Sequence, residues 1–208
     1  MNNKKGKIIA IVGPPRSGKT FFSDLLARHY KGKVILQGEE KDFPKRITED
    51  IEKNIRPLER ILWFRNMLVR KYLLALKHKN KGSVVILDTF WMSYQLHIDA
   101  LVGGFRRDVI RELAEIDRKL LSYPDIIIFL KVSEKTIRKF IKLGGRKFDN
   151  SEEFIVKQAL PISKLHENFF KKNRILADKV VIVERDSMDF EKKVDFQKII
   201  RLIERKLL

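Results

Sequence analysis

Short runs of apolar residues alternate along this chain with longer stretches in which apolar residues recur at helical spacing. The short runs are rich in Ile and Val, so the strands that they predict should be buried on both faces. Alternation of such strands with helices is typical of a parallel sheet with crossover helices. We expect five strands, at residues 7–12, 33–37, 83–88, 125–132 and 179–184.

The stretches between these strands carry the start and stop signals of helices. Pro57 opens the longest helix at an early position that tolerates proline, and Ser151 is a candidate N-cap because acidic residues follow it in the first turn. The expected helices are 18–30, 57–79, 106–121, 151–172 and 190–207. The last helix should turn its apolar residues toward the sheet, namely Phe190, Val194, Ile199, Ile200 and Ile203.

These elements predict an α/β protein in three layers, α/β/α, with a five-stranded parallel sheet and helices on both faces. A length of 208 residues lies within the usual range for one domain, and we find no internal repeat. The linker-like stretch 38–45 is too short to divide domains, so we expect a loop at the carboxyl end of a strand. Residues 1–208 are therefore expected to form a single domain.

The first predicted strand runs directly into a loop that opens the first predicted helix, Gly13-Pro14-Pro15-Arg16-Ser17-Gly18-Lys19-Thr20. A Gly-x-x-x-x-Gly-Lys-Thr sequence in this position predicts the P-loop of an NTPase fold, which binds the phosphates of ATP or GTP. Its glycines let successive N–H groups point at phosphate oxygens, and the helix N-terminus adds partial positive charge. All eight residues are candidate ATP-binding residues. Lys19 is expected to bridge the β- and γ-phosphates as a catalytic residue, and the Thr20 hydroxyl to ligate Mg²⁺.

The third predicted strand ends in a carboxylate, Asp88. Phosphoryl transfer needs such a group near the metal, at the end of a strand that lies beside the one carrying the loop. Asp88 is therefore a candidate catalytic and metal residue that would hold a magnesium-bound water. The alternative is a strand-ending Asp that caps the following helix.

The net charge of +18 and the isoelectric point near 10.0 favour an anionic partner such as nucleotide, nucleic acid or an acidic surface. Because the basic residues are spread along the whole chain, a lysine-rich surface that maintains solubility is the simpler explanation. The chain has no cysteine, which excludes disulfides and cysteine-ligated metals. No apolar run approaches the length of a membrane span, so we expect a soluble cytoplasmic protein that does not engage membranes.

In order and spacing, these motifs resemble the thymidylate kinase and deoxynucleoside kinase superfamily over roughly residues 7–185. The resemblance rests on the P-loop, the strand ending in Asp88, the segment 123–130 followed by a helix, and the segment 144–149 followed by another helix. It implies ATP as phosphoryl donor, Mg²⁺ as cofactor and nucleotide substrates. A homodimer is a further expectation.

The residue after Asp88 departs from the family pattern. The resemblance implies an arginine there that grips the acceptor, whereas this chain has Thr89. Phe90 and Ser93, which follow, fit the sequence pattern of thymidylate kinases at this place. The departure removes a charge that would hold an acceptor phosphate or polarise a hydroxyl, so the class of acceptor stays open.

The family's lid is a mobile loop that closes over the phosphates and neutralises charge in the transition state. The resemblance places it at about residues 138–150, with Arg146 as its catalytic arginine. Gly144 stands where a second arginine is expected, and the pair Gly144 and Gly145 is also suited to ending a helix. The basic residues that would compensate are Arg138, Lys142 and Lys147.

Acceptor binding is implied near the end of the second strand and along the helix at 57–79. A nucleoside acceptor needs a general base that takes the proton of its 5′-hydroxyl, whereas a monophosphate acceptor needs a cation for its phosphate. In either case an aromatic residue could stack on the nucleobase. The preferred residues for these roles are Glu39, Arg65 and Phe90, with Glu40, Arg70 and Phe64 as alternatives. The polar turn 184–187 is a candidate contact for adenine. The histidines lack metal-ligand spacing and receive no role: His29, His78, His97 and His166.

The leading hypothesis is ATP-dependent phosphoryl transfer to a nucleoside or nucleoside monophosphate. One alternative, motivated by the charge, is a P-loop protein that engages nucleic acid, either as a polynucleotide 5′-kinase or as an ATP-switched binder. The other is a nucleotide-binding regulator without turnover, motivated by Thr89 and Gly144 standing where arginines are expected.

Overall fold

All five strands lie in one parallel sheet in the computed structural model, which describes residues 6–38, 42–143, 152–173 and 176–207. The strand order is β2-β3-β1-β4-β5. The strands are β1 (Lys7–Val12), β2 (Lys33–Ile35), β3 (Val84–Asp88), β4 (Ile126–Lys131) and β5 (Val180–Glu184). The predicted α/β fold with a five-stranded parallel sheet is confirmed.

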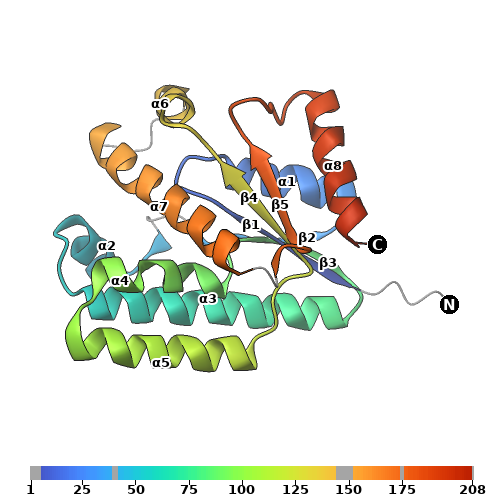
Figure 1. Ribbon diagram of the computed structural model, residues 1–208. Helices are drawn as coiled ribbons and strands as arrows, with labels where there is room; N and C mark the ends of the chain where they lie inside the picture. The colour runs from blue at the N-terminus through green and yellow to red at the C-terminus, as the bar shows by residue number, and fades with distance from the viewer. Residues whose placement is uncertain (1–5, 39–41, 144–151, 174–175, 208) are drawn as a thin grey trace.

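The central strand is β1, and its two neighbours in the sheet, β3 and β4, come one after the other in the sequence. Ile11 lies opposite Asp88 in β3, and Val12 lies opposite Phe129 in β4. The chain adds β3 and β2 on one side of β1, then crosses to β4 and β5 on the other (Figure 1). In open α/β sheets the crevice at such a reversal, outside the carboxyl ends of the strands, is the usual place for a ligand. The loop after β1 begins in this crevice.

Helices surround the sheet and connect its strands. They are α1 (Lys19–Tyr30), α2 (Lys45–Glu52), α3 (Pro57–Asn80), the 3₁₀ helix η2 (Trp91–His97), α4 (Ile98–Leu101), α5 (Gly104–Leu120), α6 (Glu134–Leu143), α7 (Glu152–Lys172) and α8 (Lys193–Leu207). The five helices expected from periodicity are all present. The candidate N-cap Ser151 lies outside the described residues.

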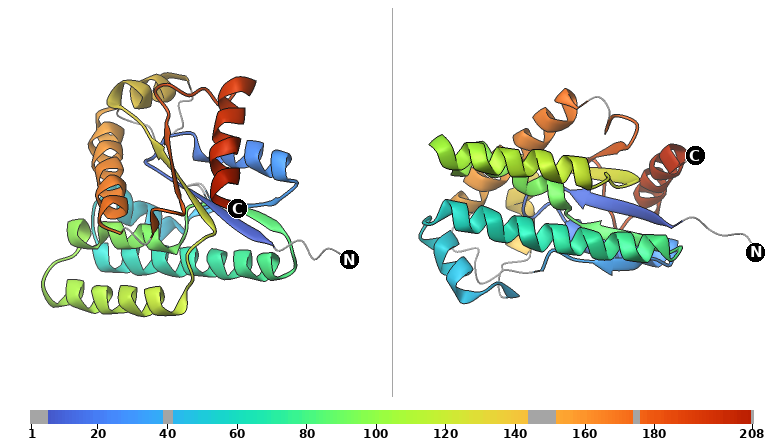
Figure 2. Two further views of the ribbon diagram at one scale, coloured as in Figure 1. Left: turned by 45° about the vertical axis from the view of Figure 1, so that its right-hand side comes forward. Right: turned by 90° about the horizontal axis from the view of Figure 1, so that it is seen from below.

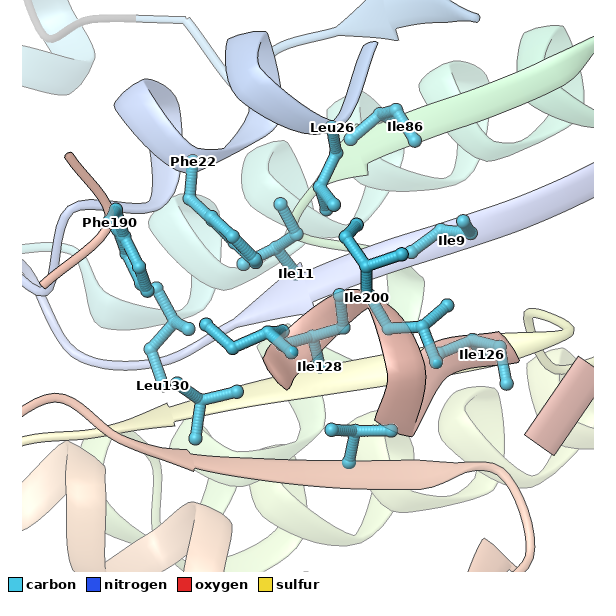
Figure 3. Packing of buried hydrophobic residues seen from close by; sticks show 14 residues of the cluster. Ile9, Ile11, Phe22, Leu26, Ile86, Ile126, Ile128, Leu130, Phe190 and Ile200 are labelled. Atoms are coloured by element: carbon cyan, nitrogen blue, oxygen red, sulfur yellow. The ribbon is translucent and has the colours of Figure 1, made fainter. Parts of the chain in front are cut away.

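Alternate residues of β1 pack into two separate cores, one on each face of the sheet. Ile9 and Ile11 pack with residues of α1 and α8, as Figure 3 shows. Ile8, Ala10 and Val12 pack on the other face, with residues of α3, η2 and α7. Helix α5 runs beside α3 on the outside of this second layer (Figures 1 and 2). Burial on both faces explains why β1 is continuously apolar.

The terminal helix differs from its prediction. It begins at Lys193, and Phe190 is buried in the segment before it. Ile199, Ile200 and Ile203 face the sheet as expected, but the prediction for Val194 is wrong because this residue is 68% exposed. At 100° per residue, Val194 lies on the side of the helix opposite those isoleucines.

Helix α2 was not predicted. It begins at Lys45, the last residue of the loop expected at 38–45. Only two of its eight residues are apolar, Ile47 and Ile51, and one of the positions that it buries is an acid, Asp50. Arg56 satisfies this carboxylate by donating from Nε to both carboxylate oxygens at 2.9 Å. None of the described helices is long and apolar enough to cross a membrane.

Candidate nucleotide site

The P-loop has a backbone that only glycine readily adopts at two of its positions. Gly18 precedes α1 with φ of 89°, and Gly13 leaves β1 with φ of 152°. A Cβ on Gly13 would lie 2.8 Å from the Leu130 carbonyl oxygen, so no side chain fits there. No side chain caps the start of α1, which leaves its first N–H groups for a ligand. This conformation is suited to holding phosphate oxygens.

The Lys19 side chain lies back over the loop that precedes it. Its ammonium donates to the carbonyl oxygens of Gly13 at 3.1 Å and Pro14 at 3.0 Å. Gly13 and Lys19 line the same cavity. The ammonium is therefore held where anionic phosphates would meet it.

Asp88 and Thr20 come together beside Lys19. The Thr20 hydroxyl donates to Asp88 Oδ2 at 3.2 Å, and the Thr89 hydroxyl donates to Asp88 Oδ1 at 3.3 Å. Asp88 is only 6% exposed. A hydroxyl and a carboxylate are hard oxygen ligands of the kind that Mg²⁺ takes in small number while keeping waters and substrate phosphates. Consistent with this, the described residues contain no cluster of three or more protein ligands.

A single cavity of about 1270 Å³ runs along the P-loop and continues on both sides of it. One side is formed by α6 and the turn after β5, and the other by α2, α3 and η2. Among its lining residues are Lys19, Thr20, Asp88, Thr89, Phe140 and Arg185, together with Phe43, Arg60, Phe64, Tyr94, His97 and His166. The cavity thus provides room for two ligands that meet at the loop.

Arg185 forms the wall on the side of the turn after β5. Its guanidinium lies 3.7 Å from the centre of the Phe190 ring and 4.9 Å from that of Phe140. It also donates to the carbonyl oxygens of Ser17 at 3.4 Å and of Met188. Burial lowers the pKa of Arg185 below the usual arginine range, although the group remains a cation. The adenine contact predicted for the turn 184–187 stays a prediction, with Arg185 lining the cavity there.

Two of the preferred acceptor residues lie away from the cavity. Arg65 forms an ion pair with Asp117 of α5, whose carboxylate also accepts from the Tyr94 hydroxyl at 2.6 Å. Phe90 is fully buried in the core beside Trp91. Neither position supports a contact with an acceptor. The alternative to Phe90, Phe64, does line the cavity, where it packs against Phe43 at 5.7 Å between ring centres.

Several other predicted residues fall outside the described part of the chain. Glu39, its alternative Glu40, and the lid residues Gly144 and Arg146 are among them. Within the segment 138–150, residues 138–143 form the end of α6. Arg138 pairs there with Glu134 at 2.7 Å, one helical turn away. The lid stays a prediction.

Arg60 is a cavity residue that sequence reasoning missed. It is 7% exposed, and its terminal nitrogens donate to neutral oxygens, the Asp50 carbonyl at 3.3 Å and the Asn54 side chain at 3.1 Å. Its Nε is buried and has no partner among the described residues. Burial lowers its pKa, and the nearby Asp50 carboxylate is already bound by Arg56. A buried cation with only neutral partners is costly unless a ligand supplies acceptors.

The fold of this chain matches that of a deoxyadenosine kinase of known structure, in agreement with the resemblance in sequence. The solved structure of deoxyadenosine kinase from M. mycoides with bound dATP matches with a TM-score of 0.70 and 17% identity, over 95% of this chain and 99% of that chain. Structures of that kinase with the products dCMP and a flexible dCDP, and with dCTP, match with TM-scores of 0.69 and 0.67. Each is 21% identical and covers 96% of this chain and 98% of that chain. No protein-family model and no curated protein sequence matches the chain.

Proposed function

We propose that this chain is an ATP-dependent kinase that phosphorylates a nucleoside or a nucleoside monophosphate. The observation that carries the proposal is the contact between Thr20 and Asp88 beside Lys19, at the centre of a cavity that continues on both sides. A donor on one side and an acceptor on the other would meet at the P-loop. The neighbours in fold support a nucleoside acceptor, because they include a deoxyadenosine kinase with the product dCMP bound, and dCMP is formed by phosphorylation of a nucleoside.

In the proposed reaction an acceptor oxygen attacks the γ-phosphorus of ATP, and the bond from that phosphorus to the β,γ-bridging oxygen breaks to release ADP. Lys19 and the P-loop N–H groups would bind the β- and γ-phosphates and hold them in line. Thr20 and Asp88 would hold Mg²⁺, which neutralises phosphate charge when bound. The predicted lid residue Arg146 would add charge on the opposite side.

The acceptor decides whether a base is needed. A nucleoside 5′-hydroxyl must lose its proton, and Glu39 or Glu40, which follow β2 in the sequence, would receive it. A monophosphate acceptor attacks through an oxygen that is already anionic and needs cations instead. Phe64 and Arg60 line the acceptor side of the cavity and are the residues proposed to contact the acceptor there.

A screen for phosphoryl transfer tests this function. Wild type and Lys19→Met would be incubated with Mg·ATP or Mg·GTP and with nucleosides, nucleoside monophosphates or 5′-hydroxyl oligonucleotides. We expect transfer to a nucleoside or monophosphate and its loss, by at least about 10²-fold, in Lys19→Met. Substitution by Met keeps the length of the side chain and removes its charge.

The same screen separates the alternatives. Transfer only to oligonucleotides, with an affinity that falls steeply with salt, would replace the proposal by the nucleic-acid function suggested by the charge of +18. Nucleotide binding without transfer to any acceptor would identify a regulator instead.

A further inference from the structure

Two histidines from distant parts of the chain line the same cavity. His97 ends η2, and His166 lies in the middle of α7. Both lie on the cavity that contains Lys19, and the charges of Lys19 and His97 both act on His166. The fold therefore brings to the cavity that Lys19 lines two imidazoles that neither a motif nor a spacing indicated.

His166 is held in one orientation. Its ring is 3% exposed and stacks on Phe129 of β4, with 5.5 Å between ring centres and 12° between planes. Its Nδ1 lies 2.8 Å from the Ile162 carbonyl oxygen, an acceptor, so Nδ1 carries a proton and donates. Nε2 has no partner among the described residues. It is the part of this buried ring left to meet a ligand in the cavity.

The surroundings of His166 oppose a positive charge while the cavity holds no anion. Burial is the largest cause, and the positive charge of Lys19 and the nearby His97 act in the same direction, so the pKa of His166 falls to about 4 despite its bond to Ile162. Burial also lowers the pKa of His97. Both rings are therefore neutral near pH 7. An anion at the P-loop would reverse this balance, because it compensates for Lys19 and attracts an imidazolium.

We propose that His166 and His97 bind the terminal phosphate oxygens of the nucleotide on the P-loop, and that His166 takes a proton from solvent to do so. Nε2 of His166 then donates to a non-bridging phosphate oxygen while Nδ1 keeps its bond to Ile162. The inference rests on the nucleotide binding proposed above and deepens it. It also provides charge near the phosphates in a chain that has Thr89 and Gly144 where the resemblance implies arginines.

The test is the proton linkage of nucleotide binding. Binding of Mg²⁺ with a non-hydrolysable ATP analogue would be measured by calorimetry from about pH 8 to about pH 5.5, in buffers of different ionisation enthalpy. The variants are His166→Phe, which keeps an aromatic ring on Phe129 and removes Nε2, and His97→Gln. His29→Gln is the matched control, because His29 lies on α1 and does not line the cavity.

We expect wild type and His29→Gln to take up more protons on binding than His166→Phe does. The affinity of wild type relative to His166→Phe should rise about tenfold for each unit by which the pH falls below the pKa of His166 in the nucleotide complex. Titration of the nucleotide itself cancels in this comparison. His97→Gln should lower the affinity, because it removes one of the two imidazoles proposed to bind the phosphate.

Equal proton uptake in wild type and His166→Phe would overturn the inference while leaving nucleotide binding intact. If wild type binds no nucleotide, the proposed function fails instead. If circular dichroism shows that His166→Phe is unfolded, the test rests on His97→Gln. An affinity for nucleotide equal to that of wild type in this variant would then overturn the inference.

Discussion

The Thr20 hydroxyl donates to Asp88 Oδ2 at 3.2 Å, which joins the first turn of α1 to the end of β3. The contact follows from the sheet, because β1 and β3 are adjacent and Ile11 is paired with Asp88. Parallel neighbours end at the same edge, so a loop after one strand meets the last residue of the next. The sheet therefore places the two oxygens together.

Removing the Thr20 hydroxyl should impair turnover more than nucleotide binding. Thr20→Val keeps the shape of the side chain and removes an oxygen ligand, so we expect kcat to fall about 10²-fold. The variant should also need a higher Mg²⁺ concentration to reach half of its maximal rate. The measurement is initial rate against Mg²⁺ concentration at saturating ATP, using the acceptor found in the screen. Thr20→Ser, which keeps the hydroxyl, should retain most of the activity. Equal activity in Thr20→Val and wild type would remove Thr20 from the metal site.

Arg60 and Arg65 provide a matched pair on one helix. Arg60→Met should raise the KM for the acceptor about tenfold or more with little change in the KM for ATP, because Arg60 lines the cavity away from the P-loop. Arg65→Met should instead lower stability by on the order of 3 kcal/mol, since it leaves Asp117, which is 2% exposed, without its cation. Steady-state kinetics and chemical unfolding separate the two effects. A rise in the acceptor KM for Arg65→Met alone would reverse the assignment.

The contrast between these arginines shows where sequence reasoning stopped. The P-loop was predictable because its chemistry and its conformation are both local, and the continuous apolar runs located every strand. The partners of Arg65 and Arg60 depend on how separate helices pack against one another. Asp117 belongs to α5, and Asp50 belongs to α2, whose buried acid hid the helix from a search for apolar periodicity.

The surroundings of Phe90 and of the two cavity histidines depend on packing in the same way. Phe90 fits a family pattern by its place after Asp88, yet it lies in the core between Tyr72 and Trp91. His97 and His166 have no mutual spacing to detect, because η2 and α7 meet only through the fold. Such residues become visible only when the elements are packed together.

Phe190 should contribute strongly to stability. It is 2% exposed, stacks on Phe22 of α1 with 4.2 Å between ring centres, and lies under the Arg185 guanidinium. Phe190→Ala should therefore lower the free energy of unfolding by about 3–5 kcal/mol. Val194→Ala, only a few residues away but exposed, should change it by less than about 0.5 kcal/mol. Urea unfolding followed by circular dichroism gives both values, and similar losses in the two variants would contradict the packing described for Phe190.

Without nucleotide, the free energy of unfolding should depend on pH because His166 is buried as a neutral imidazole in the folded chain. Its pKa is about 4 in the folded chain and near 6.5 when unfolded, so between these values the unfolded state binds more protons. Stability is thus fully present above about pH 6.5 and is lost as the pH falls toward 4, by on the order of 3 kcal/mol.

His166→Phe should flatten this dependence, because phenylalanine does not titrate and fills the same position against Phe129. The measurement is the free energy of unfolding in urea at several values between about pH 4.5 and about pH 7.5, with His29→Gln as the control. Saturating Mg²⁺ and ATP analogue should diminish the acid sensitivity of wild type, since a bound phosphate stabilises the protonated ring. Identical pH dependence in wild type and His166→Phe would show that His166 is not a buried neutral imidazole in the folded chain.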